Sequence, residues 1–262
     1  DGVRFNPAFH YLYRDLVLLD AELETALEPD GATDIELEFA TVNLLINDYA
    51  AVFAGRFLSP LGQFRQNLHP SWINKLPAAP VGFGHDQAAP SADVGVGVRG
   101  GAPVANLLWN YAVYAGNGPT LELNAAGDEI EMIGTEGTAG DPDGKKVWGG
   151  RVGLLPWPAL EIGLSAAAGK VAATPGGAAE AARDYEAQGA DLAWQWRSLR
   201  LRAEYARQKI ADQAASVAPS GGTWRAYYMQ GSSRIASTKW EGVTRYGKYR
   251  TPHADQNQEQ WA

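Results

Sequence analysis

The clearest pattern in the chain is a two-residue alternation of apolar and acidic side chains over residues 16–28. The same alternation returns over residues 33–39, after a Pro-Asp-Gly turn. Because successive side chains of a strand point to opposite faces, this period predicts two adjacent strands, each with one apolar and one acidic face. The apolar positions are Leu19, Ala21, Leu23, Thr25, Leu27, Ile35, Leu37 and Phe39, and the acidic positions are Asp20, Glu22, Glu24, Glu28, Asp34, Glu36 and Glu38.

Further alternating segments bring the number of recognisable strands to about twelve. They cover about 50–58, 94–100, 107–116, 147–155, 160–169, 188–197, 199–209, 223–231, 239–248 and the residues from 257 onward. Helix patterns are nearly absent, and the alanine-rich stretch 176–183 is too short to form a helix alone in water. The predicted fold class is all-β.

The links between the predicted strands alternate in length. Even-numbered strands are followed by short links such as 47–49, 102–104, 156–158 and 197–198. Odd-numbered strands from the third on are followed by the longer links 59–93, 117–146, 170–187 and 210–222. Short turns at one end and long loops at the other are typical of an antiparallel transmembrane β-barrel in an outer membrane. A Greek-key sandwich has no reason to sort its loops in this way.

Composition agrees with a barrel and excludes other classes. The chain has 262 residues, no Cys, a net charge of −8 and a mean hydropathy of −0.26. It contains no disulfide framework, no thiolate metal site and no apolar run of the roughly 20 residues that a membrane-spanning helix needs. The acidic balance argues against a nucleic-acid partner. We expect one barrel domain over residues 1–262, with further chain beyond Ala262.

Three short motifs resemble Gram-negative outer-membrane porins related to the phosphate-selective porin family. They are an Ala-Gly-Arg-Phe strand at 54–57 that runs into Pro-x-Gly at 60–62, an Asn-Tyr-Ala-x-Tyr strand at 110–114, and Asn-Gly-Pro at 117–119. The resemblance also includes the acidic alternating hairpin and is densest over residues 16–119. It implies a Gram-negative outer-membrane location, a barrel of about sixteen strands, and often a homotrimer. Phosphate-selective members resemble one another in their arginine and lysine ladders, for which this acidic chain has no obvious equivalent.

Charged side chains are expected to line the lumen if the apolar faces look outward. The acids come from the first two predicted strands, and the arginines come from later strands, several of them beside glycine. Rings of charged side chains select permeants by charge. A simpler interpretation is that Glu36 or Glu38 pairs with Arg56 within a filled interior, because buried charges need partners. The predicted pore-lining residues are Arg56, Arg99, Arg151, Arg200, Arg202, Glu22, Glu24, Glu36 and Glu38.

The link 59–93 is long for a compact domain, and such loops are usually functional or disordered. It combines apolar residues with Arg65, His69 and Lys75. Folding into the barrel would bury its apolar side chains, narrow the pore and make those three residues candidate constriction residues. An extracellular cap or an oligomer contact explains the composition equally well.

The sequence contains no pattern of a catalytic or metal site. Its four histidines, His10, His69, His85 and His253, have no metal-ligand spacing such as His-Glu-x-x-His. A Gly-x-Ser-x-Gly nucleophile motif and a phosphate-binding glycine loop are also absent. We therefore expect no catalytic residue, no cofactor, no metal site and no enzymatic activity.

The sequence favours a porin that admits small hydrophilic solutes or ions by passive diffusion, including anions such as phosphate. Its partners would be outer-membrane lipid and those solutes. A first alternative is a structural or docking barrel that holds a partner protein and has a plugged lumen. A second is a soluble carbohydrate-binding β-sandwich, in which the faces carrying Leu23, Phe39, Val96, Trp109 and Leu201 would pack against one another.

Overall fold

The computed structural model describes residues 3–27, 31–68, 71–135, 141, 143–235 and 238–262. Its strands are β1 (Val3–Phe5), β2 (Ala8–Tyr13), β3 (Val17–Leu27), β4 (Thr33–Asn47), β5 (Ala50–Leu58), β6 (Ala92–Val104), β7 (Leu107–Gly116), β8 (Thr120–Leu123), β9 (Ile130–Gly134), β10 (Val147–Trp157), β11 (Leu160–Val171), β12 (Arg183–Trp196), β13 (Leu199–Ile210), β14 (Gly222–Arg234), β15 (Glu241–Arg250) and β16 (Gln258–Trp261). The helical turns are η1 (Phe64–Leu68), α1 (Ser71–Asn74), η2 (Pro175–Gly177) and η3 (Ala254–Gln256).

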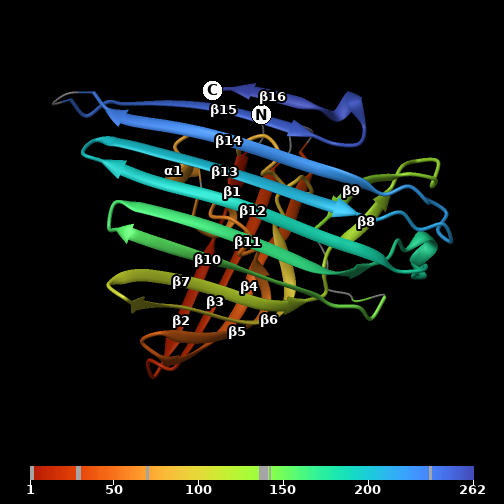
Figure 1. Ribbon diagram of the computed structural model, residues 1–262, viewed down its shortest axis with the longest axis horizontal. Helices are drawn as coiled ribbons and strands as arrows, with labels where there is room; N and C mark the ends of the chain where they lie inside the picture. The colour runs from red at the N-terminus through yellow and green to blue at the C-terminus, as the bar shows by residue number, and fades with distance from the viewer. Residues whose placement is uncertain (1–2, 28–30, 69–70, 136–140, 142, 236–237) are drawn as a thin grey trace.

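Fourteen of these strands form one antiparallel sheet, which confirms the predicted fold class. Neighbours in the sheet follow the chain order from β3 to β16, apart from the hairpin β8–β9, and both β1 and β2 pair with β3. The sheet curves so that β3 and β4 pass behind the later strands (Figure 1). Within the described residues no pairing joins β16 to β1 or β2, so the sheet does not close. Its helical turns include none that is long and apolar enough to cross a membrane.

Link length is sorted between the two ends of the sheet, as the sequence predicts (Figure 1). At one end, two-residue links follow β4, β6, β10 and β12. Both residues of the link after β6, Ala105 and Asn106, have positive φ angles of 51° and 65°. Such a turn matches the right-handed twist of the flanking strands. Long links, including 59–91 and 117–146, gather at the other end, which we call the long-loop end.

The sheet exposes its apolar face and buries its polar face, which is the reverse of the arrangement in a soluble protein. Apolar side chains on the convex face are open, as with Leu164 at 66% exposed and Val113 at 54%. Polar and charged side chains on the concave face are buried, among them Asn43, Glu204, Gln208 and Arg245. This is the alternation of a membrane barrel. One continuous sheet with its apolar face exposed excludes the sandwich alternative, in which two sheets would bury those faces.

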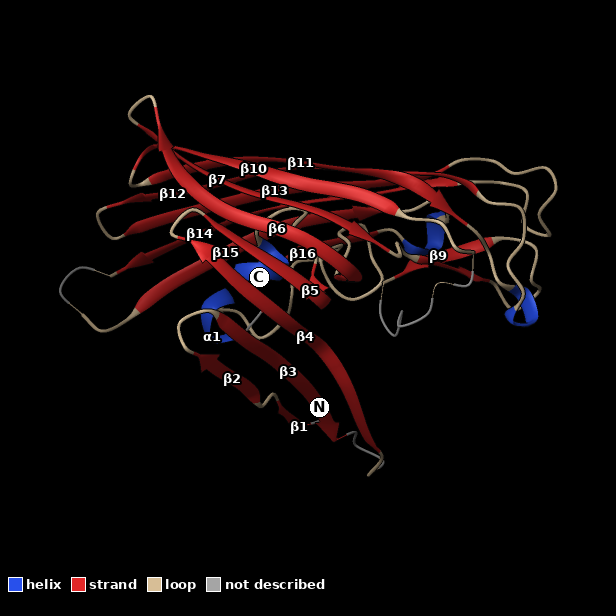
Figure 2. Ribbon diagram, turned by 90° about the horizontal axis from the view of Figure 1, so that it is seen from below, coloured by secondary structure: helices blue, strands red, loops and turns tan. Residues whose placement is uncertain are grey.

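The buried apolar cluster lies on the concave side, between the sheet and the link 59–91. Phe64 and Phe83 of that link meet Tyr228 of β14 edge to face, with ring centroids 6.1 Å and 4.9 Å away. Such pairs contribute beyond the area they bury. Figure 2 shows α1, within the same link, between the upper strands and β3.

A β-bulge places Phe39 on the concave face of β4, whereas the sequence pattern predicts the outward face. The register between β3 and β4 shifts between Glu22 and Leu23, so that Glu22 lies opposite Phe39 and Leu23 lies opposite Leu37. Glu38 is the extra residue, and beyond it the alternation of β4 changes face. Phe39, predicted to face outward with Leu37, instead lines a cavity on the concave side. A strict period of two cannot show this change.

Candidate functional site

The link 59–91, which we call the inner loop, lies across the concave face of the sheet. We call strands β13, β14 and β15 the anchor wall, because their side chains bind the backbone of this loop. The buried carboxylate of Glu204 accepts a hydrogen bond from the backbone N–H of Phe64, at 3.0 Å. Farther along β13, the buried Gln208 donates from Nε2 to the carbonyl of Gln87, at 2.9 Å. These bonds satisfy backbone groups that would otherwise be buried without partners.

Arg245 of β15 is the centre of the anchor wall, and it is only 1% exposed. Its guanidinium donates to Asn74 Oδ1 at 2.5 Å, to the Ala78 carbonyl at 2.8 Å and to Gln230 Oε1 at 2.9 Å. Gln230 in turn donates to the Asn74 carbonyl at 2.9 Å. A guanidinium carries five donors in a rigid fork, so one side chain can bind several groups of the loop at once.

Lys75, a predicted constriction residue, lies beside the anchor wall. Its ammonium group pairs with Glu241 and donates to Ser232 Oγ at 3.3 Å. Nearby, Arg202 reaches the carbonyl of Ile73 at 3.5 Å. The positive charge of Lys75 is thus paired with Glu241 of the anchor wall. His69, the second predicted constriction residue, lies outside the described residues.

The opposite wall, formed by β3, β4 and β5, carries the predicted acids, and we call it the acidic wall. Glu22 and Glu38 are buried, Glu24 is half-buried and Glu36 is exposed. Arg56 of β5 donates from Nε to the backbone carbonyl of Glu38, at 3.2 Å. The structure therefore brings all four predicted acids and Arg56 to one side of the inner loop.

Two side chains of the inner loop face the acidic wall. Arg65 is 4% exposed, and its Nη1 lies 3.4 Å from His85 Nε2. The same ring nitrogen lies 3.5 Å from Glu38 Oε1. Burial lowers the pKa of the Arg65 guanidinium, although Glu38, Asp86 and Glu24 favour its charged form. Because the ordinary pKa of arginine exceeds 12, Arg65 stays charged and partly offsets the acids.

Arg151, predicted to line the pore, is hydrogen-bonded within a buried network of side chains. Its guanidinium donates to both carboxylate oxygens of Asp191, at 2.6 and 2.8 Å. It also donates to Glu161 at 2.9 Å and to Asn110 Oδ1 at 2.8 Å. With both acids beside it and little exposed surface, Arg151 is placed to stabilise the wall rather than to meet a solute.

Arg99 lies beside a cavity of about 410 Å³ between β2–β6 and the inner loop. Its guanidinium donates to Asn43 Oδ1 at 2.8 Å and lies 5.5 Å from the ring centre of Phe53. His10 and Asp20 line the same cavity, with their side chains 2.6 Å apart. Arg99 therefore faces inward, in a setting of mixed polar and aromatic groups.

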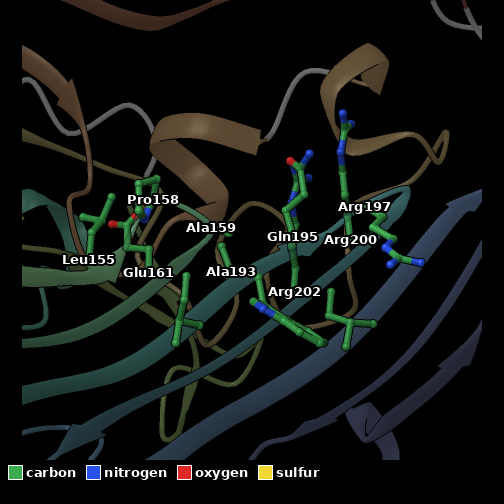
Figure 3. A pocket seen from close by; sticks show the side chains of 12 residues that line it. Leu155, Pro158, Ala159, Glu161, Ala193, Gln195, Arg197, Arg200 and Arg202 are labelled. Carbon is green, nitrogen blue, oxygen red and sulfur yellow. The ribbon is translucent and has the colours of Figure 1, made fainter.

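Arg200 and Arg202 line a cavity of about 630 Å³ at the short-turn end of β10–β13 (Figure 3). Arg197 of the adjoining turn also lines it, and Glu161 is its one acidic lining residue among those described. A second cavity of about 360 Å³ shares Arg197 and Arg200 and adds Arg234 and Glu241. We call this region the arginine vestibule. Its arginines outnumber its acids, unlike the acidic wall.

The sequence reasoning missed the residues that hold the inner loop. The alternation of β13, β14 and β15 places Glu204, Gln208, Gln230 and Arg245 on the inward face, so their direction could be inferred. Their partners could not, because Asn74 and Arg245 are separated by 171 residues in the chain. Only the folded loop brings them together.

Comparisons with known proteins connect this arrangement with outer-membrane porins. No protein-family model matches the chain, and no curated protein matches it in sequence. Among solved structures, the anion-selective porin from Comamonas acidovorans is similar with a TM-score of 0.60 and 14% identity, over 98% of this chain and 71% of that chain. OmpT of Vibrio cholerae in its trimer form gives a TM-score of 0.47 and 10% identity, over 99% of this chain and 72% of that chain. The same protein without its loop L8 gives 0.43 and 12% identity, over 95% and 86%.

The first of these similarities, together with the strand order and the outward apolar face, establishes the fold. That structure is described as anion-selective and not as phosphate-selective, so the narrower resemblance stays a prediction. The chain has the fold of an outer-membrane porin β-barrel.

Proposed function

We propose that the protein is a passive diffusion channel for small hydrophilic solutes in a Gram-negative outer membrane. The observation that carries this proposal is the exposed apolar convex face opposite a charged concave face. Lipid would cover the first face and water would fill the space along the second. Diffusion through such a channel requires no cofactor and no catalytic group.

Aromatic side chains at the short-turn end support a membrane setting. They are exposed, and each lies at or beside a turn between strands. Trp and Tyr rings are enriched where the hydrocarbon layer meets water, and barrels carry girdles of them. The residues are Tyr13, Tyr49, Trp157, Trp196 and Trp240.

The arginine vestibule supports a preference for anions. Arg197, Arg200 and Arg202 line a cavity with a single acid, whereas Arg151 is neutralised and Arg56 lies among carboxylates. Positive side chains at a mouth raise the local concentration of anions. Guanidinium groups also bind planar or tetrahedral oxyanions through paired hydrogen bonds, so small anions such as phosphate are the proposed permeants.

A docking barrel with a plugged lumen is the second candidate, and the packing of the inner loop favours it. Phe64, Phe83, Ala88 and Ala89 of this loop are almost completely buried. A loop held so firmly could close the lumen rather than narrow it. The two candidates differ in one measurable property, which is conductance.

Conductance in a planar lipid bilayer under a salt gradient tests the proposal. The channel should open in discrete ohmic steps, with a zero-current potential that favours anions. The double variant Arg200→Glu and Arg202→Glu should move that potential toward cations, whereas Lys209→Glu, an exposed charge near the long-loop end of β13, should leave it unchanged. Silence from folded protein would favour the docking barrel.

A homotrimer is part of the same proposal and can be tested separately. The resemblance to porins supports it, and the Vibrio cholerae OmpT structure is described as a trimer form. Sedimentation of the detergent-solubilised protein should give three times the mass of the chain. A monomeric mass would contradict the trimer and would leave the channel proposal standing.

A further inference from the structure

Three metal-ligating side chains meet between the acidic wall and the inner loop. Glu24 comes from β3, Glu38 from the bulge of β4 and His85 from the inner loop. Each offers one ligand atom, and these atoms all lie within 4.8 Å of one another. The three residues are far apart in the sequence, which explains why no ligand spacing is visible there.

The two carboxylates of this triad are close enough to share a positive charge. A carboxylate oxygen of Glu24 lies within 4.8 Å of one of Glu38, and Glu38 is 6% exposed. Two carboxylates so close repel each other, and a cation between them would remove that repulsion. Arg65 supplies one positive charge beside them, and a divalent cation between the three ligand atoms would supply more.

The surroundings of the triad are more acidic than basic. Besides Glu24 and Glu38, the acids that act on this region are Glu22, Glu36 and Asp86, and the described cations are Arg56 and Arg65. The acids therefore outnumber the arginines. Such an excess concentrates divalent cations from solution.

We propose that Glu24, Glu38 and His85 bind a divalent transition-metal ion of the zinc class. Two carboxylate oxygens and one imidazole nitrogen suit Zn²⁺, whereas Ca²⁺ and Mg²⁺ prefer oxygen ligands alone. Two ligands at the usual zinc distances on a tetrahedron are about 3.3 Å apart, so small side-chain rotations bring these atoms into range. Three protein ligands leave the fourth position for water.

Arg65 is the group that competes with the ion. Its Nη1 lies 3.4 Å from His85 Nε2, and its charge is attracted by both carboxylates of the triad. A bound ion would attract the same carboxylates and repel the guanidinium. Metal binding would also join the inner loop to the acidic wall, in addition to its attachment to the anchor wall.

Calorimetric titration of the full-length, detergent-solubilised protein with zinc chloride tests the site. Zinc should bind once per chain, and calcium chloride at the same concentration should not displace it. His85→Ala should weaken binding by more than about tenfold, because even the loss of an outer hydrogen-bond partner of a ligand costs that much. Glu38→Gln should weaken it similarly while nearly preserving side-chain volume.

Two further variants make the result specific. His10→Ala removes a histidine that faces one carboxylate, Asp20, and belongs to no such triad among the described residues, so zinc affinity should not change. Arg65→Gln should tighten binding, because it removes the competing charge. This opposite sign cannot arise from general loss of structure.

The proposal would be overturned by equal zinc affinity in the parent chain and in His85→Ala. It would equally be overturned by binding that is absent below millimolar zinc, or by a loss in His10→Ala as large as that in His85→Ala. Far-ultraviolet circular dichroism verifies that each variant retains its strands. Binding is measured without conductance, so this result is independent of whether the barrel is an open channel.

Discussion

The anchor wall and the acidic wall contact the same inner loop in different ways. On the anchor wall, buried aromatic rings and side chains such as Arg245 and Gln208 meet specific groups of the loop. On the acidic wall, several carboxylates share two arginines and a histidine. The contrast indicates that one wall fixes the position of the loop, whereas the other sets the electrostatic potential beside it.

Energetics explain why the two tasks are separated. Buried polar groups stabilise a fold when each has its partner, and they destabilise it when a partner is lost. Acids gathered beside one another repel, so the acidic wall costs stability unless protons or cations neutralise it. A residue of the anchor wall should therefore change stability when it is replaced, and an exposed residue of the acidic wall should change ion selectivity.

The largest expected effect comes from Arg245→Met, which removes the centre of the anchor wall. The acceptors at Asn74, Ala78 and Gln230 would each lose one donor, so the free energy of unfolding should fall by about 3 kcal/mol. Urea unfolding in lipid vesicles, followed by tryptophan fluorescence, measures this loss. The freed loop should also raise single-channel conductance.

Arg250→Met is the matched control on the same strand. Its guanidinium donates to the neighbouring Tyr249 carbonyl and is not among the groups that hold the inner loop. Stability and conductance should both stay close to those of the parent chain. Equal losses in the two variants would show that Arg245 does not anchor the loop.

A smaller loss of stability is expected from Glu204→Leu. This change leaves the Phe64 N–H without its acceptor and should lower the free energy of unfolding by about 1–3 kcal/mol. Glu204→Gln keeps an acceptor oxygen in nearly the same volume and should lose less. The same urea titration compares the two variants, and a greater loss in Glu204→Gln would contradict the role of this hydrogen bond.

The smallest effect on stability is expected from Glu36→Gln on the acidic wall. Glu36 is exposed, so its replacement should change the free energy of unfolding by less than about 0.5 kcal/mol. Removing its fixed negative charge should nevertheless move the zero-current potential toward anions. Asp184→Asn, an exposed acid near the long-loop end of β12, serves as the control and should not move the potential. Equal shifts in both variants would remove Glu36 from the pore.

The strand pattern and loop lengths predicted most of the fold, because both follow from local physics. An alternating segment such as 199–209 has one face for lipid and one for water, and its neighbours follow in chain order. The sequence reasoning missed β1, β2, β8 and β9, which are short. The bulge at Glu38 was also missed, although the exposed apolar positions change from odd numbers at Ile35 and Leu37 to even numbers at Val42, Leu44 and Ile46.

The candidate site was harder to predict, because a sequence gives the direction of a side chain but not its partner. Arg151 and Arg200 have the same inward pattern, yet Arg151 meets Asp191 and Glu161 whereas Arg200 lines an open cavity. Likewise, Lys75 and Arg65 lie in one loop and face opposite walls. These differences depend on how the inner loop folds, which no local pattern determines.

Thiol reactivity tests most directly whether the inner loop packs against the wall inside the sheet. The chain has no Cys, so one introduced cysteine reports on one position. Ala88 is 0% exposed and Ala78 is exposed. With a charged maleimide and protein in lipid vesicles, Ala78→Cys should react and Ala88→Cys should react only after unfolding. Equal rates in the folded protein would contradict the packed inner loop.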